Sequence, residues 1–128
     1  MVAKRNARKL AVLKPRCGGK MTEAAFWSWL RSQLRRSSMK WAPLYKALER
    51  VKRPNQSANK RLKWEFQCEE CNNWFPRKGV EVDHDPPVGS LRSAEDLAGF
   101  VTRLFCEEDH LRILCVACHH VRTHAGAE

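Results

Sequence analysis

The sequence has no apolar run close to the roughly 20 residues that a helix needs to cross a membrane. The longest apolar stretch near its start, Leu10 to Leu13, is also too short for the core of a secretory signal peptide. These absences argue against membrane and exported proteins, and we expect an intracellular chain without a membrane partner. In that compartment the six cysteines are more typical of metal ligands or buried thiols than of disulfides.

Acidic residues are scarce in the first half of the chain. Residues 1–63 contain 18 lysines and arginines but two acidic residues, whereas residues 64–128 contain six basic and 12 acidic residues. A basic half of this size suits DNA or RNA, because binding releases the counterions that are condensed on the phosphates. The acidic half suits a different task, such as holding cations.

The first half of the chain begins with a basic arm and continues with helices. Residues 1–20 combine cations with proline and glycine and lack a helical period, which predicts a flexible arm. Apolar residues then recur every four positions after Thr22, a suitable N-cap, so a helix is predicted over 23–37. A second helix is predicted from Pro43, a residue suited to a first turn, to about Lys52.

A boundary is predicted over 53–63, because this stretch contains turn formers and cations but no apolar face. The segment 21–63 is interpreted as a basic helical region that binds DNA. Its predicted phosphate contacts are Arg31, Arg35, Arg36, Lys60, Arg61 and Lys63. Because such contacts reach phosphates and not base edges, we expect affinity with little sequence discrimination.

The second half predicts a mixed α+β domain over 64–128. The stretches WEFQC and GVEVDH alternate apolar and polar residues, which predicts two short antiparallel strands that bracket Cys68 and Cys71. A helix is predicted over 93–105, with Ser93 as its N-cap. The stretch LRILC then leads into a short terminal helix.

Two CxxC motifs carry the strongest chemical signal in the sequence. Cys68 and Cys71 form one motif, Cys115 and Cys118 form the other, and 43 residues separate them. Four thiolates from two such motifs can close a tetrahedron around a structural Zn²⁺. In a small domain this zinc would add folding free energy on the order of 10 kcal/mol. Buried free thiols are the alternative interpretation.

Asp83 and His84 stand side by side where the second predicted strand ends. On a regular strand they point to opposite faces, and Pro86 and Pro87 stop the strand from continuing. A zinc ion bound by both CxxC motifs would bring the end of this strand close to His119, which directly follows the last cysteine of the second motif. Asp83 and His119 could then hold a divalent cation and leave His84 free as a general base, a combination suited to phosphodiester hydrolysis.

The stretches CEEC, GVEVDHDPPVGS and DHLRILCVACHHVRT, in this order, resemble the HNH nucleases of the ββα-metal type, particularly the small free-standing enzymes of tailed bacteriophages. The resemblance covers residues 64–124 and implies a zinc-stapled ββα-metal domain that hydrolyses DNA. It implies His84 as the general base, and Asp83 and His119 as ligands of Mg²⁺ or another divalent cation such as Mn²⁺. It also implies a phage origin, and with it the cytoplasm of an infected bacterial host.

One position departs from the family pattern, because His110 stands where the family usually has an asparagine that braces the active-site loop. An imidazole can donate one such hydrogen bond but cannot reproduce the geometry of an amide. We assign His110 this bracing role in the catalytic set. The resemblance also implies a phosphate contact for Arg122. Asp85 is either a second carboxylate for the cation or a side chain that faces solvent.

Two alternatives to a free-standing nuclease stay open. The chain could be a zinc-containing nucleic-acid-binding module without catalysis, in which the site histidines are structural. It could also be a nuclease that acts only with a phage packaging or restriction partner. We expect a monomer in the absence of such a partner.

The five tryptophans are interpreted mainly as packing residues. Trp27 and Trp64 have the spacing of core side chains. Trp29 and Trp41 lie among cations, and they are the two candidates for stacking on bases.

Overall fold

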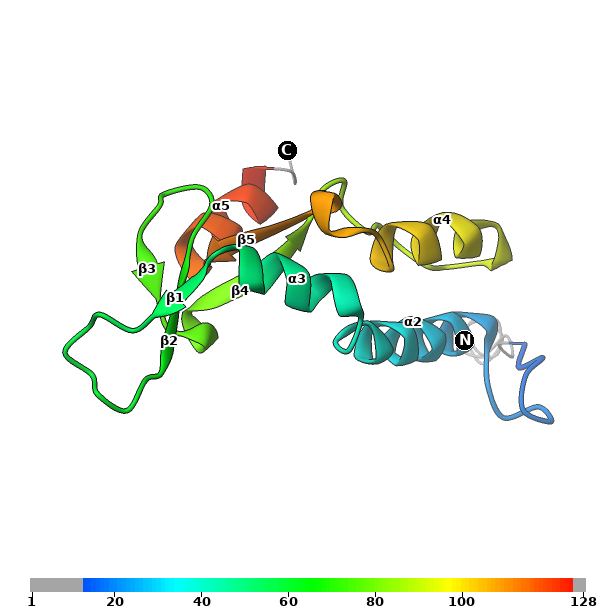
Figure 1. The fold of residues 1–128 in the computed structure, drawn as a ribbon. Coiled ribbons are helices and arrows are strands. Elements are labelled where there is room, and N and C mark those ends of the chain that lie inside the picture. The colour runs from blue at the N-terminus through cyan, green and yellow to red at the C-terminus, as the bar shows by residue number, and fades with distance from the viewer. Residues whose placement is uncertain (1–12, 126–128) are drawn as a thin grey trace, which may run out of the picture.

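The computed structural model describes residues 13–125, and their side chains as far as residue 123. A pair of helices lies at one end of the molecule and two small sheets lie toward the other (Figure 1). In chain order the elements are α2 (Glu23–Ser38), α3 (Ala42–Arg50), β1 (Lys52–Pro54), β2 (Trp64–Gln67), β3 (Trp74–Phe75), β4 (Val80–His84), α4 (Ala94–Leu104), β5 (Leu111–Cys115) and α5 (Val116–Ala125). Short 3-10 turns at Arg77–Gly79 and Glu108–His110 lead into β4 and β5.

Residues 1–12 of the predicted flexible arm lie outside the described residues. The rest of the arm is attached to α2. Arg16 and Met21 form an antiparallel bridge, and Arg16 Nε lies 2.6 Å from Glu23 Oε1. The guanidinium of Arg16 also lies 4.1 Å from the centre of the Phe26 ring. These contacts hold the described part of the arm against the start of the helix.

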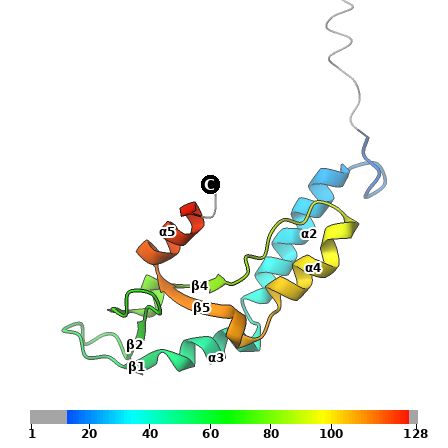
Figure 2. The same ribbon diagram turned by 90° about the horizontal axis from the view of Figure 1, so that it is seen from above.

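Helix α2 begins and packs as the sequence predicts. Thr22 Oγ1 accepts a hydrogen bond from the Ala25 N–H at 3.1 Å, which confirms the predicted N-cap. The apolar face of α2 packs on α4, where Phe100 is fully buried and Trp27 is 6% exposed. The two helices lie side by side (Figure 2). The basic helix is therefore packed against an element of the second half.

The strands belong to two separate sheets. The stretches WEFQC and GVEVDH do form strands, β2 and β4, but β2 pairs with β1 and β3, whereas β4 pairs with β5. The sequence shows no strand pattern at β1, because its three residues KRP do not alternate and its proline sits at the edge of the sheet. Helix α3 ends at Arg50 and not at Lys52, the end that the sequence predicts. Lys52 is instead the first residue of β1.

Residues from both predicted regions share one hydrophobic core. Ala47 and Leu48 of α3 pack with Phe66 of β2 and Ile113 of β5. Strands β1 and β2 also pair directly, so the predicted boundary over 53–63 is a strand and a hairpin loop inside one packing unit. The apolar face of α3 is therefore covered by residues of the second half, so the two predicted regions pack against each other.

Strands β4 and β5 and helix α5 form the part of the fold that positions the candidate site. Val82 pairs with Ile113 and Asp83 pairs with Arg112 in antiparallel register, and α5 begins directly after β5. The mixed α+β class is thus confirmed, with α4 inserted between the two strands. None of the helices in the described part of the chain has the length and apolar character that crossing a membrane requires.

Candidate metal centre and adjacent acid–histidine cluster

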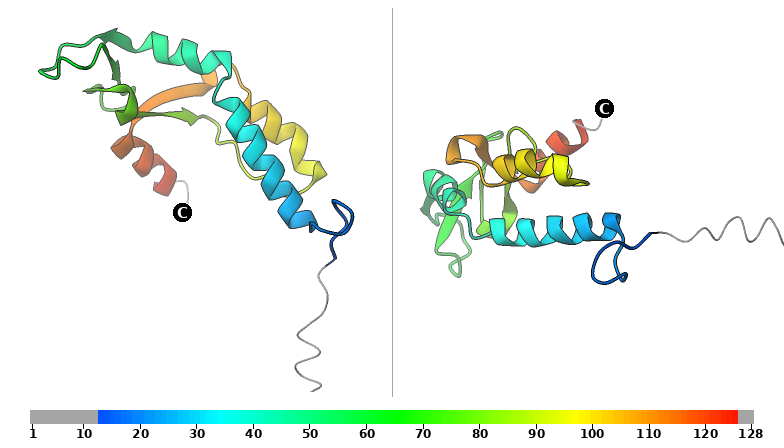
Figure 3. Two further views of the ribbon diagram at one scale, coloured as in Figure 1. Left: turned by 90° about the horizontal axis from the view of Figure 1, so that it is seen from below. Right: turned by 90° about the vertical axis from the view of Figure 1, so that its right-hand side faces the viewer.

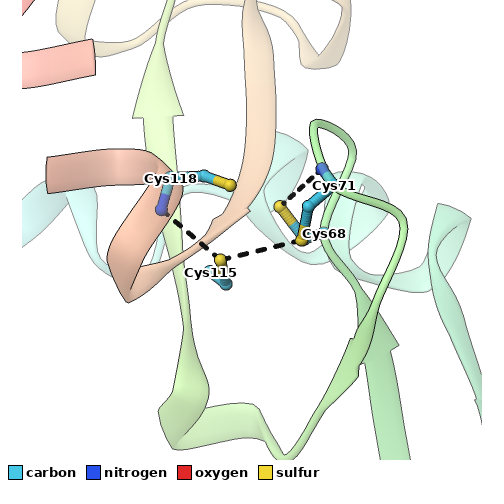
Figure 4. A group of neighbouring side chains, drawn as sticks. All are labelled: Cys68, Cys71, Cys115 and Cys118. Atoms are coloured by element: carbon cyan, nitrogen blue, oxygen red, sulfur yellow. Dashed lines mark hydrogen bonds between the residues drawn. The ribbon is translucent and has the colours of Figure 1, made fainter. Parts of the chain in front are cut away.

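The four CxxC cysteines form a compact cluster. Cys68 and Cys71 come from the loop between β2 and β3, and Cys115 and Cys118 come from the junction of β5 and α5 (Figure 4). Their sulfur atoms all lie within 4.8 Å of one another, and Cys71 Sγ and Cys115 Sγ are 3.9 Å apart. A tetrahedron of Zn–S bonds places sulfurs roughly 3.8 Å apart. The four cysteines are therefore positioned to bind a metal ion, consistent with zinc.

The backbone around the cluster already favours thiolates. Cys68 Sγ accepts hydrogen bonds from the N–H groups of Glu70 and Cys71 at 3.4 and 3.5 Å, and Cys115 Sγ accepts one from the Cys118 N–H at 3.4 Å. Burial raises the pKa of Cys68, but N–H donors outweigh it and lower the pKa to about 6. Hydrogen bonding to Cys115, with burial, raises the pKa of Cys118 to about 12. A metal ion would replace the protons that these sulfurs share.

A second set of contacts ties the same two segments together without any metal. Glu69 Oε1 accepts a hydrogen bond from the Ile113 N–H at 2.9 Å, and the Glu69 N–H donates to the Ile113 carbonyl at 2.8 Å. The guanidinium of Arg50 lies 2.7 Å from Glu69 Oε1. These contacts join helix α3, the loop that carries Cys68 and Cys71, and strand β5.

Asp83 and His119 come together beside this cluster, as the sequence predicts. Asp83 Oδ1 lies 3.5 Å from His119 Nε2. Glu81, which the sequence interpretation missed, lies on the same face of β4 two residues earlier, and its Oε2 is 2.6 Å from His119 Nδ1. The alternation of GVEVDH is the signal that could have identified Glu81, because it places Glu81 and Asp83 on one face of the strand.

One oxygen of Asp83 is buried without a hydrogen-bond donor among the described residues. Asp83 Oδ2 accepts no hydrogen bond from any group that the structure describes, although Arg122 Nε lies 3.1 Å from it. The guanidinium thus supplies positive charge without a well-directed N–H. Ligand atoms that share a small divalent cation lie roughly 3 Å apart, so the 3.5 Å between Asp83 Oδ1 and His119 Nε2 is close to that spacing. The donor set of one carboxylate and one imidazole is suited to such an ion.

His84 lies on the other face of β4. Its ring is half-buried, and its Nε2 lies 3.2 Å from the Leu104 carbonyl at the end of α4. A carbonyl can only accept, so Nε2 carries the proton and Nδ1 is the basic nitrogen. Burial lowers the pKa of His84, and the positive charge of Arg35 lowers it further. The structure therefore brings Asp83 and His119 together and directs His84 toward α2 and α4, as alternation on a strand predicts.

His110 contacts the loop that follows β4. Its Nδ1 lies 3.1 Å from the Asp85 carbonyl, and its own carbonyl accepts a hydrogen bond from the Asp85 N–H at 2.9 Å. Because a carbonyl only accepts, the ring donates this bond through Nδ1–H. His110 thus makes one side-chain and one backbone bond to the residue after His84.

The predicted phosphate contacts fall on three surfaces. The exposed members are Arg35 and Arg36 on α2 and Lys60, Arg61 and Lys63 on the β1–β2 loop, and Arg31 is half-buried on α2. Arg122 differs from the prediction, because it faces carboxylates: besides Asp83, its Nη2 lies 3.7 Å from Asp85 Oδ1. In this structure Arg122 therefore neutralises the acidic side of β4 and does not present an unpaired guanidinium to a phosphate.

The tryptophans divide between core and surface. Trp27 is 6% exposed, as predicted for a core residue. Trp41 is half-buried and its indole N–H donates to a backbone carbonyl at 2.6 Å, which indicates packing. The core prediction for Trp64 is wrong: this side chain is 37% exposed, and Lys52 Nζ lies 4.4 Å from the centre of its ring. Trp29 is 51% exposed on α2.

Comparisons of the chain with protein-family models, with curated proteins and with solved structures found no match. The interpretation of the site therefore depends on its own geometry. Its described features are four clustered sulfurs, a carboxylate beside an imidazole, and a half-buried histidine, with its pKa lowered by burial, at the end of the same strand.

Proposed function

We propose that this protein is a metal-dependent endonuclease of the HNH type that hydrolyses phosphodiester bonds in DNA. The observation that carries the proposal is the 3.5 Å approach of Asp83 Oδ1 to His119 Nε2. It occurs beside the four-cysteine cluster, at the end of a strand whose last residue is His84. The order of elements, β4, β5 and α5, agrees with the ββα arrangement that the resemblance implies.

Asp83 and His119 would hold the divalent cation, Mg²⁺ or another ion such as Mn²⁺. When bound, the cation would neutralise charge on the phosphate and on the leaving oxygen. Glu81 Oε2 lies 2.6 Å from His119 Nδ1, a contact that would help to hold the ring with Nε2 beside Asp83. A carboxylate in this position orients a ligating imidazole and raises its basicity.

His84 would remove the proton from the attacking water through Nδ1, since its Nε2–H is engaged with the Leu104 carbonyl. Asp83 and His84 occupy the last two positions of β4 and flank the end of the strand. A phosphate lying across this strand end would be in reach of both faces. His110 holds the loop directly beyond it through Asp85, which supports the bracing role.

Plasmid cleavage tests the proposal. The zinc-loaded protein should convert supercoiled plasmid into nicked or linear DNA with Mg²⁺ or Mn²⁺, and EDTA should stop the reaction. His84→Ala and Asp83→Asn should each reduce cleavage by at least about 100-fold, the scale of general base catalysis. Glu95→Gln, which removes an exposed carboxylate on α4, serves as the matched control. Cleavage that survives His84→Ala would exclude this mechanism.

One observation favours a second function, a zinc-containing DNA-binding module without catalysis. His84 is half-buried and bonded to a backbone carbonyl, as a structural histidine would be. If no divalent cation supports cleavage while the zinc-loaded protein binds DNA, the binding module is the better description.

A further inference from the structure

A cleft of about 540 Å³ lies between the α2–α3 corner and β4. Figure 3 shows β4 running into the angle between the two helices. Arg35 and Arg36 line the cleft from the end of α2, Arg77 lines it from the turn before β4, and His84 lines its other end. The cleft thus joins the basic helix to the histidine at the end of the strand.

The three arginines of the cleft differ from most others in the described chain. No described carboxylate lies within ion-pair distance of Arg35, Arg36 or Arg77, whereas at least one lies within that distance of Arg50, Arg53, Arg112 and Arg122. Arg77 donates one hydrogen bond, to the Val80 carbonyl at 3.2 Å, which leaves most of the five N–H donors of its guanidinium for a ligand. Three unpaired cations around one cleft favour an anion.

The remaining lining explains why the anion would be part of a larger molecule. Glu81 is the one acidic residue of the lining, and its carboxylate is turned to His119 at 2.6 Å. The rim carries Met39, which is 72% exposed, and Tyr45, which is 54% exposed. Cations beside exposed apolar side chains suit a phosphate that is followed by a sugar. The cations bind the phosphate, and the apolar side chains pack against the sugar.

We propose that this cleft binds the phosphodiester backbone of the DNA strand next to the bond at which His84 acts. Arg77, together with Arg35 and Arg36, holds a phosphate there, and Arg77 is a DNA-binding residue that the sequence interpretation did not identify. This cleft proposal depends on the proposed nuclease function in one respect, since it takes DNA as the ligand. The experiment that tests the cleft measures DNA binding and needs no cleavage.

Binding can be measured by fluorescence anisotropy with a labelled DNA duplex. The zinc-loaded His84→Ala protein is used without added divalent cation, so that no strand is cut. Arg77→Ala in this background should weaken binding about tenfold, the scale of a lost charge-assisted phosphate contact. The slope of log Kd against log salt should also fall by about one.

Lys78→Ala is the matched control, because Lys78 is the exposed neighbour in the same turn and does not line the cleft. It removes the same charge and should weaken binding about twofold or less. Arg36→Ala is the second variant: it lies on the exposed end of α2 and should weaken binding as Arg77→Ala does, without affecting the Val80 contact. Equal losses for Arg77→Ala and Lys78→Ala would overturn the proposal.

The outcomes separate this proposal from the proposed function. If the wild-type protein cleaves plasmid but Arg77→Ala and Arg36→Ala bind DNA as Lys78→Ala does, the cleft proposal fails and the nuclease proposal stands. If Arg77→Ala and Arg36→Ala lose affinity while no cation supports cleavage, the cleft binds DNA in a protein that is not a nuclease.

Discussion

Asp83 and His84 are neighbours in the sequence but lie in different electrostatic environments. Asp83 faces α5, where Arg122 and His119 supply positive charge or N–H groups. His84 faces α2 and α4, where burial and the charge of Arg35 disfavour its protonated form. The strand places the two side chains against different elements, but the charge of Asp83 still acts on His84 and raises its pKa.

The lowered pKa of His84 predicts the pH dependence of cleavage. Burial holds this pKa below its ordinary value of 6.5, so the ring stays neutral at a pH where an exposed histidine is charged. A reaction that needs neutral His84 should rise with pH, with the midpoint of the rise below pH 6.5. NMR titration of the His84 ring in the cation-free protein and the pH profile of kcat/KM should give the same low value. A ring pKa above 6.5 would contradict the structure.

The same shift affects stability. In the unfolded chain His84 takes up a proton near pH 6.5, whereas in the folded protein it does so only at a lower pH. The contribution of neutral His84 to the free energy of unfolding is therefore complete above pH 6.5 and decreases as the pH falls below that value.

Glu81 should matter for cation binding more than its exposed position suggests. Glu81→Ala removes the carboxylate that lies 2.6 Å from His119 Nδ1, and the ring of His119 is then free to turn. We expect the affinity for Mn²⁺ to fall about 10- to 100-fold, the usual cost of losing such an orienting partner. Isothermal titration calorimetry measures this directly, without any cleavage assay.

Two variants control this experiment. Glu81→Gln keeps a side chain of the same size with an oxygen beside His119 Nδ1, and it should retain most of the affinity. Glu95→Ala removes an exposed carboxylate from α4, away from the site, and should have little effect. If Glu81→Ala and Glu95→Ala lower Mn²⁺ affinity equally, Glu81 acts through bulk charge and not through His119.

At the scale of the elements, the cysteine cluster connects the β2–β3 loop to the start of α5. Cys118→Ser should abolish tight binding of one zinc per chain and loosen α5, so that His119 no longer stays beside Asp83. Elemental analysis should give about one zinc per chain for the wild type, and amide exchange in α5 should accelerate in the variant. Cys17→Ser is the control, because Cys17 is exposed and outside the cluster. Unchanged zinc content in Cys118→Ser would overturn the assignment.

Much of this arrangement could be predicted from local sequence signals. The CxxC spacing indicates a cluster of Cys68, Cys71, Cys115 and Cys118 whatever separates the two motifs, and the structure places the four sulfurs together. The position of His119 directly after Cys118 then indicates its closeness to Asp83, and the two lie 3.5 Å apart. The prediction for His119 succeeds because His119 directly follows Cys118 in the chain, whereas Asp83 comes to the same place through the pairing of β4 with β5.

The remaining features depend on pairing between distant segments, which single residues do not indicate. β1 forms because β2 offers a partner, not because KRP favours a strand. Trp64 is the first residue of β2 and pairs with Pro54, and its side chain is 37% exposed. Arg122 looks like a phosphate ligand in the sequence, but the fold places Asp83 and Asp85 next to it. Tertiary contacts decide all three positions.

At the scale of the whole molecule, the two electrically different halves are one packing unit. Ala47, Leu48 and Val51 precede the predicted boundary, and they are buried against Phe66 and Ile113, which follow it. The basic half therefore does two tasks: its exposed cations form the proposed DNA-binding surface, and its apolar face completes the core under the candidate site.

This shared core predicts that residues 64–128 will not fold cooperatively when they are expressed alone. Without α3, the fragment loses buried Leu48 and Val51, each worth about 1.5–3 kcal/mol, and exposes the faces of Phe66 and Ile113. Such losses are large beside the 5–15 kcal/mol that typically separates folded from unfolded domains. Zinc can still order the two CxxC loops, but it cannot replace this apolar surface. We expect the zinc-loaded fragment to give a poorly dispersed NMR spectrum and no sharp thermal transition, whereas the full chain gives both a dispersed spectrum and a sharp transition. Addition of the separate segment 21–63 should restore dispersion, and a fragment that folds cooperatively by itself would show that the cysteine-clamped half is an independent domain after all.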